Sequence, residues 1–233
     1  DSCNYYFYEV GYRLATNNYS TAYNDSLGIE KLQKYASLFG LNERTGIEIE
    51  EAAPQIANEF PVMAAIGQSN NNYTTVQLAR YVTAVANEGT VYQYTLLNRL
   101  EDSDGNVLQT FEPQVRNQID VLDTEEWNAI HSGMRMVVEN TKEFDGFPIE
   151  AAGKTGTAQQ NLKRPNHALF VGYAPYDDPE ISIATRIAYG YTSHNAAKLA
   201  RNVFAYYFNV ENEDELLNGQ AANGNSSSNE ISD

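Results

Sequence analysis

The sequence of 233 residues contains a single cysteine, Cys3, and only three histidines. One cysteine cannot form a disulfide within the chain, and it offers no set of thiolates for a zinc site. The histidines, His131, His167 and His194, are too scattered along the sequence to predict a metal site. We expect Cys3 to be a small packed side chain. We expect His167 and His194 to be structural or solvated rather than catalytic.

Basic residues are also scarce. The sequence has 15 lysines and arginines and 31 aspartates and glutamates, which gives a net charge of −16. This charge repels the phosphates of nucleic acids and anionic membrane surfaces, so we expect no nucleic-acid partner. No run approaches the roughly 20 apolar residues of a membrane helix, and no signal peptide is recognisable. The chain begins with Asp1 rather than methionine, so we expect that an upstream segment has been removed.

Apolar residues make up 42% of the sequence, which is enough for a folded core. Apolar side chains at helical spacing predict helices in five segments. These segments are residues 2–15, 28–40, 73–89, 123–138 and 194–208. Asp123 can cap the fourth helix together with Glu126 three residues further on. Two short apolar runs in residues 96–111 flank the turn 102–106, which predicts a β-hairpin.

Three segments near the C-terminus predict an antiparallel sheet. They are residues 153–159, 167–175 and 181–190, and turn residues separate the last two. The helix 194–208 would cover one face of this sheet with an apolar stripe that consists of Ala196, Leu199, Ala200, Val203, Phe204 and Tyr207. Helices followed by antiparallel strands and a covering helix predict an α+β fold.

The composition of the chain changes at residue 210. Residues 1–210 carry the patterns of helices and strands, and we expect them to form the folded part. Residues 211–233 contain six acidic residues, no bases and a run of glycine, asparagine and serine. Such a segment has too little apolar surface to bury, so we expect a disordered tail.

The segment Gly153–Gln159, with the sequence GKTGTAQ, is unusual for a strand. Glycine weakens a strand, and where it occurs it often marks a place where a ligand or another backbone comes close. The hydroxyl groups of Thr155 and Thr157 and the ammonium group of Lys154 would face the approaching group. The pattern therefore indicates a binding edge.

The residues Lys154-Thr155-Gly156-Thr157 at the head of a strand, with Ser2-Cys3-Asn4 upstream, resemble two motifs of the penicillin-binding protein transpeptidase domain. Further segments resemble the same family in the same order, namely residues 66–68, 74–90, 132–138 and 167–175. The resemblance covers roughly residues 1–208. Ala158-Gln159 after the second motif resembles the class B proteins, and residues 2–11 most resemble their elongation-type, PBP2-like branch.

The resemblance implies a role for each residue of the second motif. Lys154 would supply the positive charge for the carboxylate of a D-alanyl peptide or a β-lactam, and Thr155 and Thr157 would add hydroxyl hydrogen bonds. The backbone N–H of Thr157 would form half of an oxyanion hole. Gly156 would leave room for the backbone of the acyl-enzyme. These four residues are the candidate substrate-binding set, and Lys154 and Thr157 also count as candidate catalytic residues.

The resemblance also assigns roles to Ser2 and Asn4. Ser2 would relay protons between Lys154 and the lysine of the family's Ser-x-x-Lys motif, and Asn4 would hold the amide of the donor peptide. Taken without the family, the two residues are equally well explained as N-caps of the helix 2–15, because serine and asparagine favour that position. Both interpretations can hold together.

The family's nucleophile motif is absent from this sequence. Covalent acyl transfer needs a nucleophile with a base within reach, and no Ser-x-x-Lys or Thr-x-x-Lys occurs in residues 1–233. We therefore expect this motif on an upstream segment of the same protein, together with the family's first two sheet strands. Alone, this chain is expected neither to become acylated nor to turn over. The implied fold is the β-lactamase/transpeptidase type, an antiparallel sheet packed by helices with an all-helical subdomain.

The activity that the resemblance implies is that of a peptidoglycan D,D-transpeptidase. Through an acyl-serine intermediate such an enzyme cross-links stem peptides that end in D-Ala-D-Ala, and it binds β-lactams such as penicillin. It would need no cofactor or metal. It would act on the extracytoplasmic face of the bacterial membrane, anchored by an upstream transmembrane helix, alongside other cell-wall synthesis proteins. Three alternatives remain: a carboxypeptidase, a non-catalytic penicillin-binding sensor or scaffolding module, and, least favoured, a β-lactamase.

Overall fold

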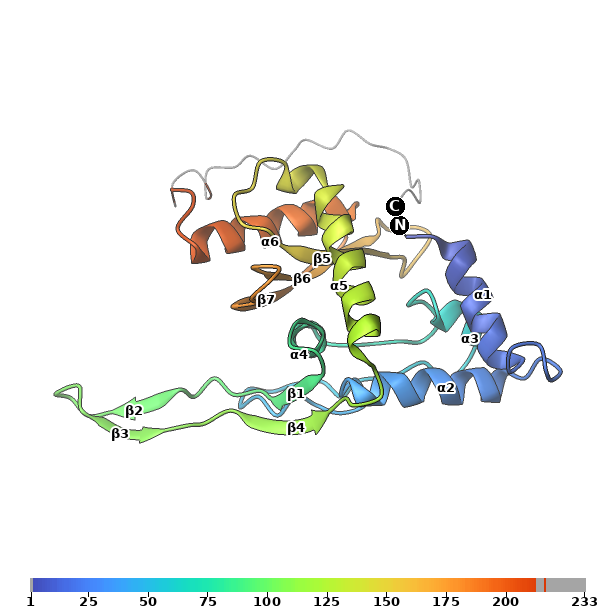
Figure 1. The fold of residues 1–233 in the computed structure, drawn as a ribbon, viewed down its shortest axis with the longest axis horizontal. Coiled ribbons are helices and arrows are strands. Elements are labelled where there is room, and N and C mark those ends of the chain that lie inside the picture. Colours follow the sequence, from blue (N-terminus) through green and yellow to red (C-terminus); the bar gives the residue numbers. More distant parts are fainter. Residues whose placement is uncertain (1, 213–215, 217–233) are drawn as a thin grey trace. The chain divides into compact units, whose positions relative to one another are not determined.

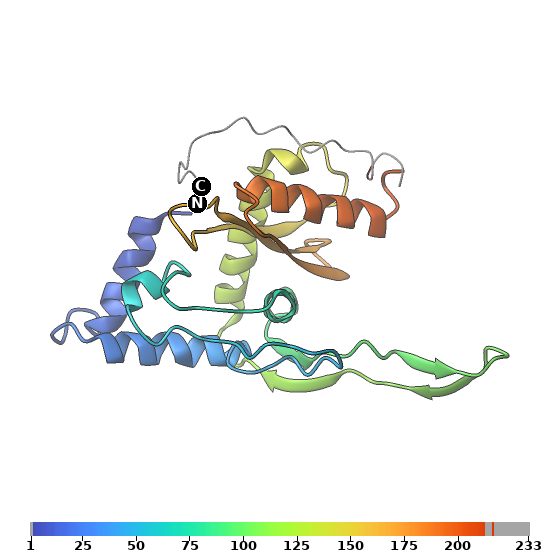
Figure 2. The same ribbon diagram turned by 180° about the vertical axis from the view of Figure 1, so that it is seen from behind.

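The computed structural model describes residues 2–212 and Leu216. By their contacts these residues divide into two compact units. We call the unit that contains Ser2 and the residues from Thr124 onward the sheet unit, and the unit from Cys3 to Asp123 the helical unit. Figures 1 and 2 show the ribbon from opposite sides.

The helical unit begins with helices that pack closely through glycine. Its helices are α1 (Asn4–Ala15), α2 (Asp25–Leu38), α3 (Pro61–Ala64) and α4 (Thr75–Ala86). A Cβ atom on Gly11 of α1 would lie 2.7 Å from the Cα atom of Val62, and one on Gly28 of α2 would lie 2.7 Å from the Cβ atom of Pro61. Both α1 and α2 therefore lie against α3 at a distance that only glycine permits. The helices expected in residues 2–15, 28–40 and 73–89 are confirmed.

A buried arginine joins α4 to the loop that follows α2. The side chain of Arg80 is 1% exposed. Its guanidinium donates to the backbone carbonyl oxygens of Gly40, Glu43 (3.1 Å) and Arg44 (3.2 Å), and it lies 3.9 Å from the Glu43 carboxylate. Gly40 has a positive φ of 74°, and a Cβ atom there would lie 2.7 Å from Nη2 of Arg80. The Arg80 side chain thus holds the loop through the loop's main-chain carbonyl groups. Burial lowers the pKa of the Arg80 guanidinium.

The predicted hairpin is present in the helical unit. Strand β2 (Arg99–Glu101) pairs antiparallel with β3 (Val107–Thr110). In the turn between them the Asp102 carboxylate accepts hydrogen bonds from the backbone N–H groups of Asp104 and Asn106, at 2.9 and 2.8 Å. The side-chain and backbone hydrogen bonds from Asn106 lower the pKa of Asp102. The turn residues therefore fix the hairpin as the sequence predicts.

A second strand pair in this unit was not predicted. Strand β1 (Thr90–Gln93) pairs antiparallel with β4 (Gln114–Gln118), and Figure 1 shows both pairs along one extended arm. The sequence of β4 is QVRNQ, and all but one of its residues are exposed. With Val115 as its one apolar residue, the segment carries no alternating apolar pattern from which a strand could be read.

The sheet unit contains the predicted three-stranded antiparallel sheet. Its elements are α5 (Thr124–Glu139), the 3₁₀ helix η1 (Lys142–Phe144), β5 (Ala152–Ala158), β6 (His167–Ala174), β7 (Ile181–Ile187) and α6 (Ser193–Tyr207). The strands lie in the order β5-β6-β7, and β6 pairs antiparallel with both neighbours. Helix α6 packs against β6 and β7, and α5 packs against β5. The expected α+β fold is confirmed.

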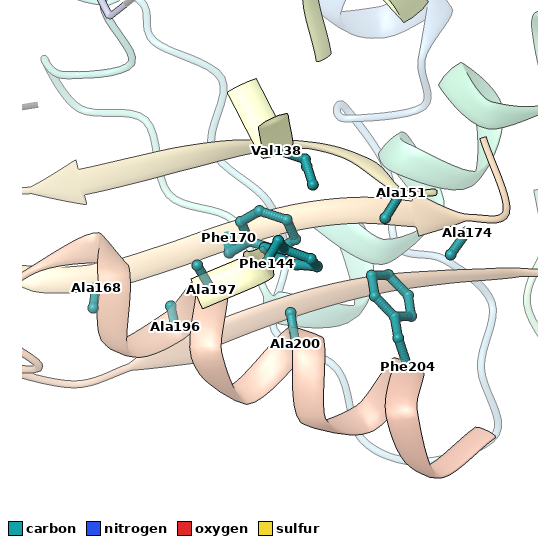
Figure 3. Close-up of a cluster of buried hydrophobic side chains, with 10 residues drawn as sticks. All are labelled: Val138, Phe144, Ala151, Ala168, Phe170, Ala174, Ala196, Ala197, Ala200 and Phe204. Atoms are coloured by element: carbon teal, nitrogen blue, oxygen red, sulfur yellow. The ribbon is translucent and has the colours of Figure 1, made fainter. Parts of the chain in front are cut away.

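The core of the sheet unit lies between the sheet and α6, with Phe170 of β6 near its centre (Figure 3). The ring of Phe170 stacks on that of Phe144 at 5.7 Å. The residues of α6 in this core are Ala196, Ala197, Ala200 and Phe204, so part of the predicted stripe is confirmed. The prediction for Leu199, Val203 and Tyr207 was wrong, because these side chains are 37–46% exposed. Alanines let the helix lie close to the strands, and this close contact turns the larger side chains outward.

The expected tail lies mostly outside the described residues. At its start Glu211 accepts hydrogen bonds from both terminal nitrogens of Arg201 on α6. These bonds lower the pKa of the Glu211 carboxyl. The first residue of the segment 211–233 is therefore held on the sheet unit, and the disorder expected for the rest remains a prediction.

Two absences hold for the described part of the chain. None of its helices combines the length and the apolar character needed to cross a membrane. Within the same residues, no three histidine, cysteine, aspartate or glutamate side chains are placed to hold a metal ion.

Candidate functional site

The candidate site lies on β5, which is an outer strand of the sheet. Among the described strands β5 pairs with β6 alone, so its other edge carries backbone groups that no strand uses. The residues from Lys154 to Ala158 are all half-buried. An outer strand of this kind is where an extended peptide can add as a further strand.

The two glycines of β5 differ in what surrounds them. A Cβ atom on Gly153 would lie 2.3 Å from Cζ of Phe170 and 2.8 Å from the carbonyl oxygen of Val171, so the packing of the sheet itself requires this glycine. At Gly156 the nearest atom to such a Cβ would be the Cβ of Leu169 at 3.5 Å, an ordinary contact, and the φ angle lies outside the left-handed region. Among the residues that the structure describes, neither packing nor backbone conformation explains Gly156.

Lys154 lies beside Ser2, from which it is separated by 152 positions in the sequence. Its Nζ atom donates to the Oγ atom of Ser2 at 2.5 Å and to the carbonyl oxygen of Thr155 at 2.8 Å. A hydroxyl group can accept one hydrogen bond and donate another, so Ser2 can pass a proton to or from this ammonium. Because alternate residues of a strand share a face, Gly156 lies on the same face as Lys154.

The N-terminus of α1 corrects two expectations. The N-cap residue is Cys3, with an extended backbone and no side-chain hydrogen bond to the helix, so neither Ser2 nor Asn4 caps α1. Cys3 is exposed rather than packed. Asn4 is the first residue of α1, is exposed, and belongs to the helical unit. The structure therefore brings Ser2 to Lys154, while the role of Asn4 remains a prediction.

Arg135 of α5 supports the entry into β5, a role that was not predicted from the sequence. Its Nη1 atom donates to the carbonyl oxygen of Ala151 at 3.3 Å, and Nη2 lies 3.2 Å from the carboxylate of Glu150. Its Nε atom lies 3.5 Å from Glu139, one helical turn further along α5. Arg135 thus anchors the residue that precedes β5. The only signal in the sequence is that Arg135 falls within residues 132–138, one of the segments that resemble the family.

The family model of the penicillin binding protein transpeptidase domain matches residues 1–205. The chain belongs to this family. The fold of the β-lactamase/transpeptidase type and the resemblance to class B penicillin-binding proteins are both confirmed.

Individual relatives agree with the family assignment. Peptidoglycan D,D-transpeptidase MrdA of Haemophilus influenzae is 31% identical over 90% of this chain and 35% of its own length. Penicillin-binding protein 2A of Bacillus subtilis is 26% identical over 85% of this chain and 31% of its own. The chain therefore spans about a third of the length of these two relatives.

Solved structures share the fold. Penicillin-binding protein 2B of Streptococcus pneumoniae strain R6 superposes with a TM-score of 0.77 at 24% identity, over 90% of this chain and 38% of that one. Penicillin-binding protein A of Mycobacterium tuberculosis, solved as an imipenem acyl-enzyme complex, gives a TM-score of 0.74 at 22% identity, over 89% of this chain and 45% of that one. At these identities the likeness concerns the fold of the transpeptidase domain, and the roles of the residues on β5 remain predictions.

Proposed function

We propose that this chain is the C-terminal portion of a class B peptidoglycan D,D-transpeptidase, and that β5 is the edge on which its acyl group binds. The observation that carries the proposal is the Lys154 ammonium, hydrogen-bonded to the Ser2 hydroxyl at 2.5 Å, on a strand edge that also bears Gly156. The proposal gives a purpose to a glycine that the sheet does not need.

In the proposed complex, the acyl chain of a stem peptide or a β-lactam lies along the outer edge of β5. Lys154 attracts the carboxylate of this ligand, and the hydroxyl groups of Thr155 and Thr157 donate hydrogen bonds to it. The backbone N–H of Thr157 donates to the acyl oxygen, where negative charge develops in the tetrahedral intermediate. One such fixed donor is worth about 2.7–4 kcal/mol of transition-state stabilisation. Asn4 holds the donor peptide's amide.

The nucleophile of the proposed reaction lies outside this chain. A serine on another segment attacks the carbonyl carbon of the D-Ala-D-Ala bond, the bond to the terminal D-Ala breaks, and D-Ala leaves with a proton. An amine of a neighbouring stem peptide then attacks the acyl-serine ester and releases the serine. Ser2 passes protons between Lys154 and the base that accompanies this nucleophile. No Ser-x-x-Lys occurs in residues 1–233, which supports this division of the site between segments.

The relatives support the wider setting of this proposal. Their names include peptidoglycan D,D-transpeptidase, and one solved relative forms an acyl-enzyme with imipenem. We propose accordingly that the full-length protein binds β-lactams, acts outside the cytoplasm from a membrane anchor, and works with other cell-wall synthesis proteins. A non-catalytic penicillin-binding module is the rival, and it predicts a full-length protein that binds penicillin without cross-linking stem peptides.

The two glycines of β5 provide a matched test of the binding edge. In the full-length protein, Gly156→Ala is expected to lower the second-order rate of acylation by fluorescent penicillin about 10–100-fold, because a methyl group displaces the ligand from a productive position. Its free energy of unfolding should change by less than about 0.5 kcal/mol. Gly153→Ala should instead lower that free energy by about 1–3 kcal/mol, because its methyl group overlaps the Phe170 ring.

Urea denaturation and the acylation rate separate these two effects. If Gly156→Ala is acylated at the wild-type rate, no ligand approaches β5 at that residue, and the proposed binding edge is wrong. If it destabilises the protein as much as Gly153→Ala does, Gly156 serves packing instead of binding.

A further inference from the structure

A histidine joins several segments at the end of β5. His167, the first residue of β6, pairs with Ala158, the last residue of β5, and it is 7% exposed. Its Nε2 atom lies 3.0 Å from Oε1 of Gln160, which follows β5 by two residues. Its Nδ1 atom accepts a hydrogen bond from the backbone N–H of Tyr189 at 3.1 Å, and the two rings lie 4.9 Å apart.

These contacts define the protonation state of His167. Because the Tyr189 N–H donates to Nδ1, that nitrogen carries no proton, and the proton of the neutral ring lies on Nε2, where it donates to the Gln160 oxygen. The charged groups that face the ring are cations. Nη2 of Arg186 on β7 lies 3.5 Å from Nε2, and Arg164, from the loop before β6, donates to the Tyr189 hydroxyl at 2.6 Å. Burial first, and Arg186 second, lower the pKa of His167 below 6.5.

The turn after β7 depends on this contact. Tyr189 and Tyr191 both have positive φ angles, 54° and 66°. This conformation costs a bulky residue about 1–3 kcal/mol and persists only where the surrounding structure enforces it. Gly190 between them has no room for a side chain, since a Cβ atom would lie 2.8 Å from the Cβ of Ala168. The backbone N–H of Tyr191 donates to the carbonyl oxygen of Asn166 at 3.1 Å. The turn is therefore pressed onto the start of β6, and the imidazole supplies one of the bonds that hold it.

We propose that neutral His167 is a positioning residue for the binding edge, because one ring fastens both the chain leaving β5 and the turn after β7. This inference rests on the proposed function, since the position of β5 affects chemistry only if a ligand docks there. Protonation of Nδ1 would set a donor against the Tyr189 N–H and add a cation beside Arg186. The latch formed by His167, Gln160 and Tyr189 is thus closed above pH 6.5 and opens as the pH falls through the lowered pKa of the ring.

The first test is local and does not depend on penicillin. In this chain, ¹⁵N NMR of the side chain of His167 should show a neutral ring protonated at Nε2 with a titration midpoint below 6.5. Amide exchange at Tyr189, corrected for its intrinsic pH dependence, should accelerate below that midpoint. The control is His194, an exposed residue on α6 that pairs with Glu143 at 2.8 Å, and its substitution by asparagine should leave exchange at Tyr189 unchanged. A proton on Nδ1 at neutral pH would overturn the inference. So would an amide exchange rate at Tyr189 that does not change as His167 titrates.

The second test uses the full-length protein and two isosteric variants. His167→Asn keeps an acceptor near the position of Nδ1, His167→Gln keeps a donor near that of Nε2, and neither side chain titrates. The ratio of wild-type to His167→Asn acylation rates should fall about tenfold per pH unit below the midpoint, because the neutral fraction falls in that proportion. A ratio that stays constant from pH 8 to one pH unit below the midpoint found by NMR contradicts the latch. If the wild-type protein is not acylated at any pH, the proposed function fails, and the NMR result still decides the state of the ring.

Discussion

Lys154→Ala in the full-length protein is expected to lower the rate of penicillin acylation by about 10²–10⁴-fold, the range that a positioned proton-transfer group contributes. The substitution removes both the charge that is proposed to attract the ligand's carboxylate and the hydrogen bond to Ser2. Ser2→Ala removes only the hydroxyl and leaves the ammonium, so its loss should be smaller. The second-order rate constant with fluorescent penicillin measures both variants.

The matched control is Lys198→Ala, which removes the same side chain from an exposed position on α6. This variant should be acylated at the wild-type rate, which shows that the effect of Lys154→Ala does not arise from net charge. If Lys154→Ala retains wild-type acylation while Ser2→Ala loses it, the ammonium has no part in the reaction and the role proposed for Lys154 is wrong.

Arg80→Met is expected to have the largest effect on stability, a loss of about 3–5 kcal/mol in the free energy of unfolding. Methionine fills a similar volume but donates no hydrogen bond. The carbonyl oxygens of Gly40, Glu43 and Arg44 would each lose the hydrogen bond that the guanidinium donates, in a place where the arginine side chain itself is 1% exposed. Urea denaturation of this chain, followed by circular dichroism, measures the loss.

Arg116→Met is the control for Arg80→Met, because Arg116 pairs with the same glutamate. Its Nη2 atom lies 3.0 Å from the Glu43 carboxylate, but its side chain is 49% exposed. Exposed ion pairs contribute little, so this variant should unfold with the wild-type midpoint. Equal destabilisation by the two substitutions would show that the pair with Glu43, rather than the buried bonds to carbonyl oxygens, holds the loop.

The sequence predicted those helices and strands whose formation depends on residues close together in the chain. The turn at Asp102 is closed by its own side chain, so the hairpin could be read from a few residues. The strands β6 and β7 carry apolar and β-branched runs separated by turn residues, and their antiparallel pairing follows the prediction. The short helix α3 was missed because it begins only after Phe60 takes a φ of 52° ahead of Pro61, a turn that composition does not reveal.

The candidate site was only partly readable from the sequence. The chemistry of Lys154, Thr155 and Thr157 follows from their residue types, but the pairing of Lys154 with Ser2 joins distant segments, and only the family resemblance could suggest it. Gly153 and Gly156 look alike in the sequence, and they are distinguished by the Phe170 ring that lies next to one of them alone. For His167 the sequence predicts a structural or solvated side chain. Its burial fits the structural reading, while its bonds to Gln160 and Tyr189 depend on tertiary contacts that no local pattern encodes.

The most direct test of the account is mass spectrometry after reaction with a labelled penicillin, performed on this 233-residue chain and on the full-length protein. The account predicts no covalent adduct on the chain alone, and a single adduct on the full-length protein at a serine outside residues 1–233. An adduct on any residue of this chain would contradict it, and one on Ser2 most clearly, since Ser2 would then be the nucleophile rather than the proton relay beside Lys154.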